Sequence, residues 1–113
     1  MIQIFHNSRC GKSRSCLAFI EESGKEFEVI KYLENTPTLE ELTNIIEKLK
    51  ITPIELVRTK EKIWIENYKN KTLSDKEIIQ AMISNPILIE RPIVINGDKA
   101  VIARPFDKAK SIL

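Results

Sequence analysis

The sequence predicts an α/β fold in which a mixed four-stranded sheet has flanking helices and an inserted helical subdomain. Short apolar segments suited to strands stand near both ends of the chain, at residues 2–5 and 93–103. A block of helical pattern, approximately residues 36–84, lies between them. The chain has 113 residues with 42% hydrophobic content, which suits a single domain spanning residues 1–113.

The first third of the chain predicts a β-α-β unit. Residues 2–5 form an apolar run typical of a strand, and residues 13–22 carry apolar side chains at helical spacing. Ser23-Gly24-Lys25 supplies a stop signal, after which residues 27–32 alternate like a half-buried strand. The crossover between the two strands should be right-handed.

The middle of the chain predicts helices. Thr38 is a suitable N-cap, Glu41 stands at the capping-box position, and an apolar stripe continues to Leu49. Ser74 and Glu77 repeat the capping-box pattern. Shorter helical pieces are expected at residues 53–57, 61–67 and 74–83, with Trp64 and Tyr68 packing within them.

The last third predicts two antiparallel strands and a short helix. Residues 87–89 are expected to begin a strand that continues through 93–95, and Asn96-Gly97 signals a hairpin into 100–103. Residues 105–112 are expected to form a short final helix. This order, with a cysteine after the first strand, is typical of a thioredoxin-like mixed sheet, and a cis peptide before Pro92 fits it.

Composition limits the partners and the location. The formal net charge of +2 is too small to indicate a nucleic-acid or membrane partner. The start of the chain lacks a charged and apolar leader, and its apolar runs are far shorter than a membrane span. Two cysteines in such a chain fit a reducing compartment, so we expect a cytoplasmic protein.

Cys10 is the leading candidate for a catalytic residue because it falls where the first strand gives way to a helix. Unpaired backbone N–H groups at that terminus, together with Arg9, Lys12, Arg14 and His6, should lower its pKa below the free value of about 8.5. The thiolate would then be a nucleophile at neutral pH. The same donors would make an anion site, so nucleophile and oxyanion pocket can coincide.

Cys16 is a poor partner for a disulfide with Cys10. Along a helix, the six-residue step from Cys10 to Cys16 rises about 9 Å and turns the side chains about 120° apart. A disulfide needs Cα atoms within about 7 Å. We therefore expect Cys16 to be a small buried hydrophobe on the inner face of the first helix.

His6 and Ser13 are further candidates beside the thiol. His6 can be a hydrogen-bonded cap of the first strand or an electrostatic partner that lowers the Cys10 pKa, and we favour the second role. Ser13 can be an ordinary first-turn residue or a donor to the sulfur or to an anion.

Arg58, Arg91 and Arg104 each stand beside an apolar segment rather than within a charged helix. A planar guanidinium donates paired hydrogen bonds to phosphate-like oxygens, so three of them could form a clamp for a tetrahedral oxyanion. The alternative is three strand-end arginines in ordinary ion pairs. From the pattern alone both interpretations remain open.

Five segments in order resemble the glutaredoxin-coupled arsenate reductases of the ArsC type, relatives of the Spx-type regulators. They are His6-Asn7-x-x-Cys10-Gly11-x-Ser13-Arg14, Tyr32-Leu33-Glu34-Asn35-x-Pro37, Leu56-Val57-Arg58, Asn85-Pro86-Ile87-Leu88-Ile89-x-Arg91-Pro92-Ile93-Val94 and Ala103-Arg104-Pro105. The resemblance implies a thioredoxin-like fold with an inserted helical subdomain. It also implies that Cys10 is the nucleophile, that Arg58, Arg91 and Arg104 bind the oxyanion, and that His6 and Ser13 tune the thiolate.

The same resemblance implies an oxidoreductase that reduces arsenate to arsenite for arsenic detoxification. A covalent Cys10 thiol-arsenate adduct would be resolved by glutathione as co-substrate and by glutaredoxin, with no bound cofactor and no metal. The alternative is an Spx-like transcriptional regulator that contacts RNA polymerase, or another thiol oxidoreductase on this fold. Spx-type proteins usually sense oxidation through a Cys-x-x-Cys pair, and the second position here is Ser13.

Overall fold

The computed structural model describes all residues, 1–113, and divides them into two compact units. The first unit joins Met1–Asn35 to Arg91–Leu113, and the second is Thr36–Glu90. The second unit thus extends to Glu90, beyond the end near residue 84 that the sequence indicated.

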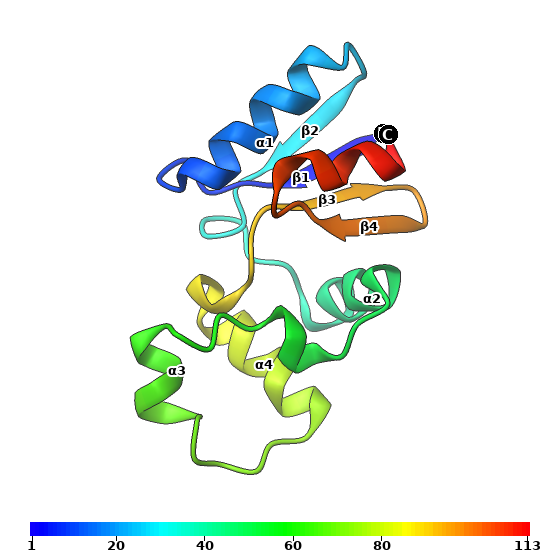
Figure 1. Cartoon of the computed structure of the whole chain (residues 1–113). Helices are drawn as coiled ribbons and strands as arrows, with labels where there is room; N and C mark the ends of the chain where they lie inside the picture. The colour runs from blue at the N-terminus through cyan, green and yellow to red at the C-terminus, as the bar shows by residue number, and fades with distance from the viewer. The chain divides into compact units, whose positions relative to one another are not determined.

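The first unit is built on a four-stranded mixed sheet in the order β2-β1-β3-β4 (Figure 1). The strands are β1 (Ile2–Phe5), β2 (Phe27–Ile30), β3 (Ile93–Asn96) and β4 (Lys99–Ile102). β1 pairs in parallel with β2 and antiparallel with β3, and β3 pairs antiparallel with β4. This confirms the mixed sheet that the sequence predicted.

Helix α1 (Gly11–Glu22) and the 3-10 helix η3 (Phe106–Ile112) pack on the sheet around one apolar core. The core forms because the apolar positions of both helices face Ile4 and Val94 of the central strands. Asn96 Nδ2 ties the hairpin to η3 by donating a 2.6 Å hydrogen bond to the carbonyl oxygen of Ile112. The buried residues of this core are Ile2, Ile4, Cys16, Ile20, Val94, Ala103 and Ala109.

The second unit is helical: α2 (Leu39–Leu49), η1 (Pro53–Leu56), α3 (Lys62–Asn67), α4 (Asp75–Ser84) and η2 (Pro86–Leu88). Both predicted capping boxes are present, since the side chain of Thr38 accepts from the Glu41 N–H and that of Ser74 from the Glu77 N–H. Trp64 is buried and stacks on Tyr68 with ring centroids 5.3 Å apart. The packing role predicted for this pair is confirmed. None of the helices has the length and apolar character needed to cross a bilayer.

Two strand predictions need correction. Residues 87–89 do not begin a strand of the sheet: Pro86 starts a turn of 3-10 helix, and Ile89 makes only an isolated bridge to Val57. Proline at the first helical position, where its missing N–H is not needed, favours that turn. β2 ends at Ile30 rather than 32, because Lys31 begins a turn in which its carbonyl accepts from the N–H groups of Glu34 and Asn35.

The C-terminal predictions hold otherwise. Asn96 and Lys99 bound the hairpin, and Gly97 adopts the positive φ of 64° that the tight turn requires. The final helix is present as a 3-10 helix. The Arg91-Pro92 peptide is cis, as expected, and so is Arg104-Pro105.

Candidate active site

Cys10 is the N-cap residue of α1, with extended backbone dihedrals of φ −97° and ψ 121°. The loop before it is held by its own backbone: the Cys10 N–H donates to the Asn7 carbonyl at 3.0 Å, and the Asn7 side-chain oxygen accepts from the Arg9 N–H at 3.0 Å. The thiol is free and half-buried. Its position at the start of the helix is the one that the sequence predicted.

The environment of Cys10 lowers its pKa below the ordinary value of 9.0. Burial would raise the pKa, but the Ser13 backbone N–H, the Arg91 guanidinium and the Lys12 backbone N–H together outweigh it. The sulfur closes no capping hydrogen bond to the helix, so these N–H groups favour the thiolate through their partial charge at close range. Arg9 and Arg14, which the sequence suggested as contributors, are not among the groups that lower it.

Cys16 has the opposite environment. It is fully buried in the core, and burial raises the pKa of its thiol to about 11. A protonated, enclosed thiol is not a nucleophile at neutral pH. The prediction that Cys16 is a small buried hydrophobe is confirmed.

The Ser13 hydroxyl contacts Asn7 and His6, whereas the sequence suggested it as a donor to the sulfur or to an anion. The side chain is fully buried, its Oγ accepts a 3.0 Å hydrogen bond from the Asn7 N–H, and it lies 2.8 Å from His6 Nδ1. Both contacts fix the loop before Cys10 against the first turn of α1. Ser13 therefore lowers the Cys10 pKa through its backbone N–H, while its hydroxyl holds the loop.

His6 directly follows β1 and makes hydrogen bonds to Ile30 and Ser13. The backbone N–H of His6 donates to the Ile30 carbonyl at 2.9 Å, which extends the pairing of β1 with β2. Burial lowers the His6 pKa against the effect of a backbone hydrogen bond with Ser13, and the positive charges of Lys31 and Arg14 lower it further. A ring with a pKa below 6.5 is mostly neutral at pH 7, and His6 is not among the groups that lower the Cys10 pKa, whereas the sequence favours an electrostatic role for it. Its ring instead contacts the Ser13 hydroxyl.

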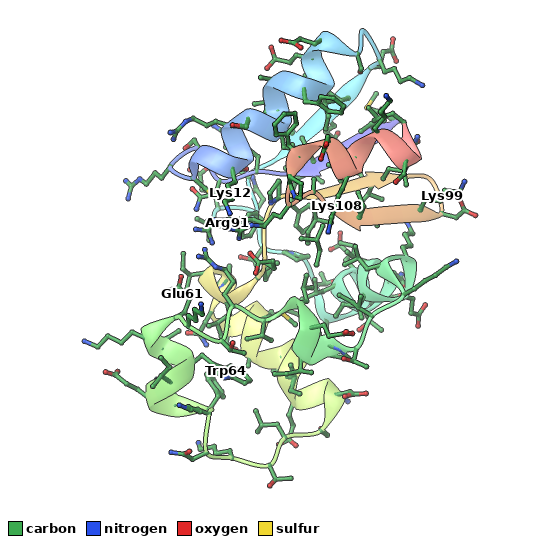
Figure 2. All side chains as sticks on the ribbon, in the orientation of Figure 1. Lys12, Glu61, Trp64, Arg91, Lys99 and Lys108 are labelled. Atoms are coloured by element: carbon green, nitrogen blue, oxygen red, sulfur yellow. The ribbon has the colours of Figure 1, made fainter.

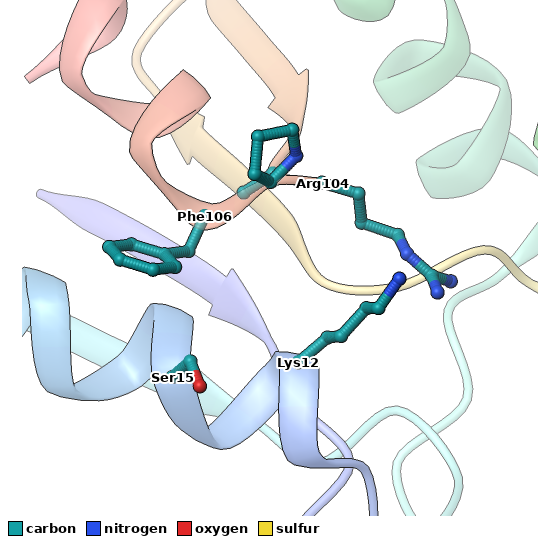
Figure 3. A pocket seen from close by; sticks show the side chains of 6 residues that line it. Lys12, Ser15, Arg104 and Phe106 are labelled. Atoms are coloured by element: carbon teal, nitrogen blue, oxygen red, sulfur yellow. The ribbon is translucent and has the colours of Figure 1, made fainter.

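Two of the three predicted arginines belong to the same unit as Cys10. Arg91 precedes β3, and its hydrogen bonding and charge both favour the Cys10 thiolate. Figure 2 shows Arg91 and Lys12 beside the N-terminal end of α1. Arg104 follows β4 and lines a pocket together with Lys12 (Figure 3).

Arg58 belongs to the second unit. The backbone N–H of Arg58 donates to the Leu88 carbonyl at 2.7 Å. Its guanidinium pairs with the Glu61 carboxylate at 3.6 Å and with the Glu90 carboxylate at 4.0 Å. Arg58 therefore makes ordinary ion pairs, which is the alternative that the sequence left open for the three arginines. One of its side-chain donors, the buried Nη1, makes no hydrogen bond within the protein.

Asn7 has a structural role that the sequence pattern did not indicate. It is buried, and it contributes its N–H, its carbonyl and its side-chain oxygen to the loop that carries Cys10. The available signal was the preference of asparagine for turns in which its side chain bonds the backbone two residues on. No cluster of three or more His, Cys, Asp or Glu side chains is placed to hold a metal ion.

A mixed sheet whose first strand leads into a helix with a free, half-buried cysteine at its N-cap defines the class of thioredoxin-like proteins. The chain belongs to the ArsC family, whose model matches residues 5–112.

Relatives match nearly the whole chain. An arsenate reductase of Neisseria meningitidis is 39% identical, with 99% of this chain and 97% of the relative covered. The uncharacterized protein YfgD of Escherichia coli is 40% identical over 99% of this chain and 96% of its own length. The solved structure of an arsenate reductase from Vibrio cholerae superimposes with a TM-score of 0.94 at 39% identity, covering 99% of this chain and 97% of that one.

Proposed function

We propose that this protein is an arsenate reductase that works with glutathione and glutaredoxin in the cytoplasm. The observation that carries the proposal is the Cys10 thiol, whose pKa is lowered by the start of α1 and by Arg91. Membership of the ArsC family and full-length similarity to proteins named arsenate reductase support the choice of substrate.

The first step follows from the charges at the site. The Cys10 thiolate attacks arsenic, a sulfur–arsenic bond forms, and one arsenate oxygen takes up protons and leaves as water. A thiolate and an arsenate anion repel each other, and the Arg91 guanidinium offsets that repulsion beside the sulfur. We assign Arg104, which belongs to the same unit as Cys10 and Arg91, to the remaining arsenate oxygens.

The two electrons that reduce arsenic must come from other thiols, because Cys16 is enclosed. In our scheme glutathione adds to arsenic with loss of a second water. A glutaredoxin thiolate then attacks the glutathione sulfur, and the electron pair of the sulfur–arsenic bond stays on arsenic, which becomes As(III). Water hydrolyses the bond to Cys10 and releases arsenite, and the glutaredoxin–glutathione disulfide carries the oxidation away.

An Spx-like regulator is the weaker proposal. Such a switch needs a second cysteine at the position of Ser13, and Ser13 is instead buried against His6. A regulator would capture RNA polymerase subunits and would consume no thiol in response to arsenate.

The test is arsenate-dependent NADPH oxidation coupled through glutaredoxin, glutathione and glutathione reductase. We expect turnover by the wild type, none by Cys10→Ser, and a kcat/KM roughly 10- to 150-fold lower for Arg91→Ala, the loss expected for a charge-assisted clamp. Arg9→Ala removes a neighbouring exposed cation and should change little. Unchanged turnover after Cys10→Ser, or no turnover by a folded wild type, would overturn the proposal.

A further inference from the structure

A pocket of about 330 Å³ opens beside the start of α1 within the first unit. Lys12 and Ser15 line it from α1, and the segment after β4 supplies the rest, namely Ala103, Arg104, Pro105 and Phe106. This volume is near the lower end of the range for small-molecule sites, roughly 300–1,000 Å³. It is larger than a tetrahedral oxyanion needs, so arsenate alone would leave it mostly empty.

The pocket is cationic at one end and apolar at the other. Figure 3 shows the Lys12 and Arg104 side chains extending toward each other, with the Phe106 ring on the far side. No carboxylate ion-pairs with Lys12. The Phe106 ring contacts Phe19, whose ring centroid is 5.4 Å away at an interplanar angle of 56°. A ligand that fits must carry an anionic group and a compact, partly apolar body.

Lys12 connects this pocket to the reactive sulfur. Its backbone N–H is one of the groups that lower the Cys10 pKa, while its side chain lines the pocket. A molecule seated there lies next to the residue that contacts Cys10. The reaction proposed above needs such a neighbour, because a small thiol must reach the Cys10 adduct.

We propose that this pocket binds the carboxylate of the small thiol co-substrate through Lys12 and orients its sulfur toward Cys10. The proposal rests on the proposed function and adds a binding site for the thiol. A carboxylate with no ammonium beside it suits the Lys12 ammonium better than a zwitterionic amino-acid group does. In glutathione, that group is the glycyl carboxylate.

The test uses thiol–disulfide exchange at Cys10, which needs no arsenate. Cys10 is first converted to its mixed disulfide with thionitrobenzoate. An added thiolate attacks the Cys10 sulfur, a new sulfur–sulfur bond replaces the old one, and the electron pair leaves with the coloured aromatic thiolate. The two probes are glutathione and its glycyl monoethyl ester, which differ in that one charge and have the same thiol.

For the wild type we expect glutathione to react roughly three to ten times faster than the ester, the range of a surface charge pair. In Lys12→Gln this ratio should fall to about one, and Lys12→Arg should restore it. Arg9→Gln removes the same charge from an exposed neighbour outside the pocket and should keep the wild-type ratio. Ser15→Phe, which fills the pocket without changing charge, should slow glutathione while leaving the small neutral thiol mercaptoethanol unaffected.

A wild-type ratio of one would overturn the proposed binding site, because the carboxylate would then have no effect on the rate. An equal fall of the ratio in Lys12→Gln and Arg9→Gln would also overturn it, because it would assign the preference to general electrostatics. Neither result would touch arsenate reduction, which the NADPH assay measures separately. Conversely, a protein inactive on arsenate could still show the Lys12-dependent ratio. The two proposals therefore fail independently.

Discussion

The Ser13 Oγ lies 2.8 Å from His6 Nδ1 and accepts a 3.0 Å hydrogen bond from the Asn7 N–H. A neutral imidazole protonated at Nε2 can accept the hydroxyl proton at Nδ1, and we assign this tautomer because the His6 pKa is lowered. One hydroxyl thereby joins the end of β1 to the first turn of α1. The Cys10 loop, which lies between them, depends on this bond.

Ser13→Ala should destabilise the protein by about 1–3 kcal/mol, because it leaves the Asn7 N–H and the His6 ring nitrogen buried without their partner. Urea unfolding followed by circular dichroism measures this loss. Ser15→Ala is the matched control: it is exposed on the same helix and should cost less than about 0.5 kcal/mol. Equal losses for the two variants would show that the buried hydroxyl does not stabilise the loop.

His6 makes stability depend on pH in the weakly acidic range. Its folded-state pKa lies below the unfolded value of 6.5, so below that pH the unfolded chain binds more protons than the folded one. The free energy of unfolding should therefore fall as the pH falls from about 6.5 to 5.5 and should be insensitive to His6 above about pH 7.5. Urea midpoints across this range, in a Cys10→Ser background that removes the titrating thiol, measure the slope.

The control for this slope is His6→Asn in the same background. Asparagine keeps a polar side chain but does not titrate, so its unfolding free energy should vary less over the same interval. The exposed Glu55 and Glu77 also have lowered pKa values, but they titrate below 4.5 and lie outside the window. An identical slope in the two proteins would remove His6 as its source.

Arg91→Gln should raise the pKa of Cys10, since the guanidinium favours the thiolate by hydrogen bonding and by charge. The rate of alkylation by iodoacetamide against pH reports this pKa, and the profile should move to higher pH in the variant. Arg9→Gln, which removes an equal charge from the adjacent loop position, should leave the profile in place. A shift of the same size in both would assign the effect to net charge rather than to Arg91.

The parts of the fold with local signals were predictable from the sequence. Thr38 with Glu41 and Ser74 with Glu77 mark helix starts because each capping box closes within one turn. Asn96-Gly97 marks the hairpin for the same reason. At residues 87–89 the sequence predicts a strand and the structure has a 3-10 turn, because a short apolar run fits both equally well.

The site was predictable only as far as its chemistry is local. The position of Cys10 at a helix start follows from the order of strand and helix. The role of His6 could not be predicted from the sequence, because its burial and its contact with Ser13 arise from tertiary packing. The meeting of Lys12 with Arg104 at one pocket is likewise a property of the folded chain, since they lie at opposite ends of the sequence.

The two cysteines should separate activity from stability. Cys16→Ala removes a fully buried core atom, so we expect a loss of about 1–2 kcal/mol in unfolding free energy with turnover kept, because the proposed cycle uses no second enzyme thiol. Cys10→Ala should do the reverse: the thiol makes no capping hydrogen bond, so stability should change by less than about 0.5 kcal/mol while turnover is abolished. Urea unfolding and the coupled NADPH assay on both variants measure the pair. Loss of turnover in a folded Cys16→Ala protein would show that Cys16 takes part in the chemistry, and the burial that raises its pKa to about 11 would then have to be relieved during the cycle.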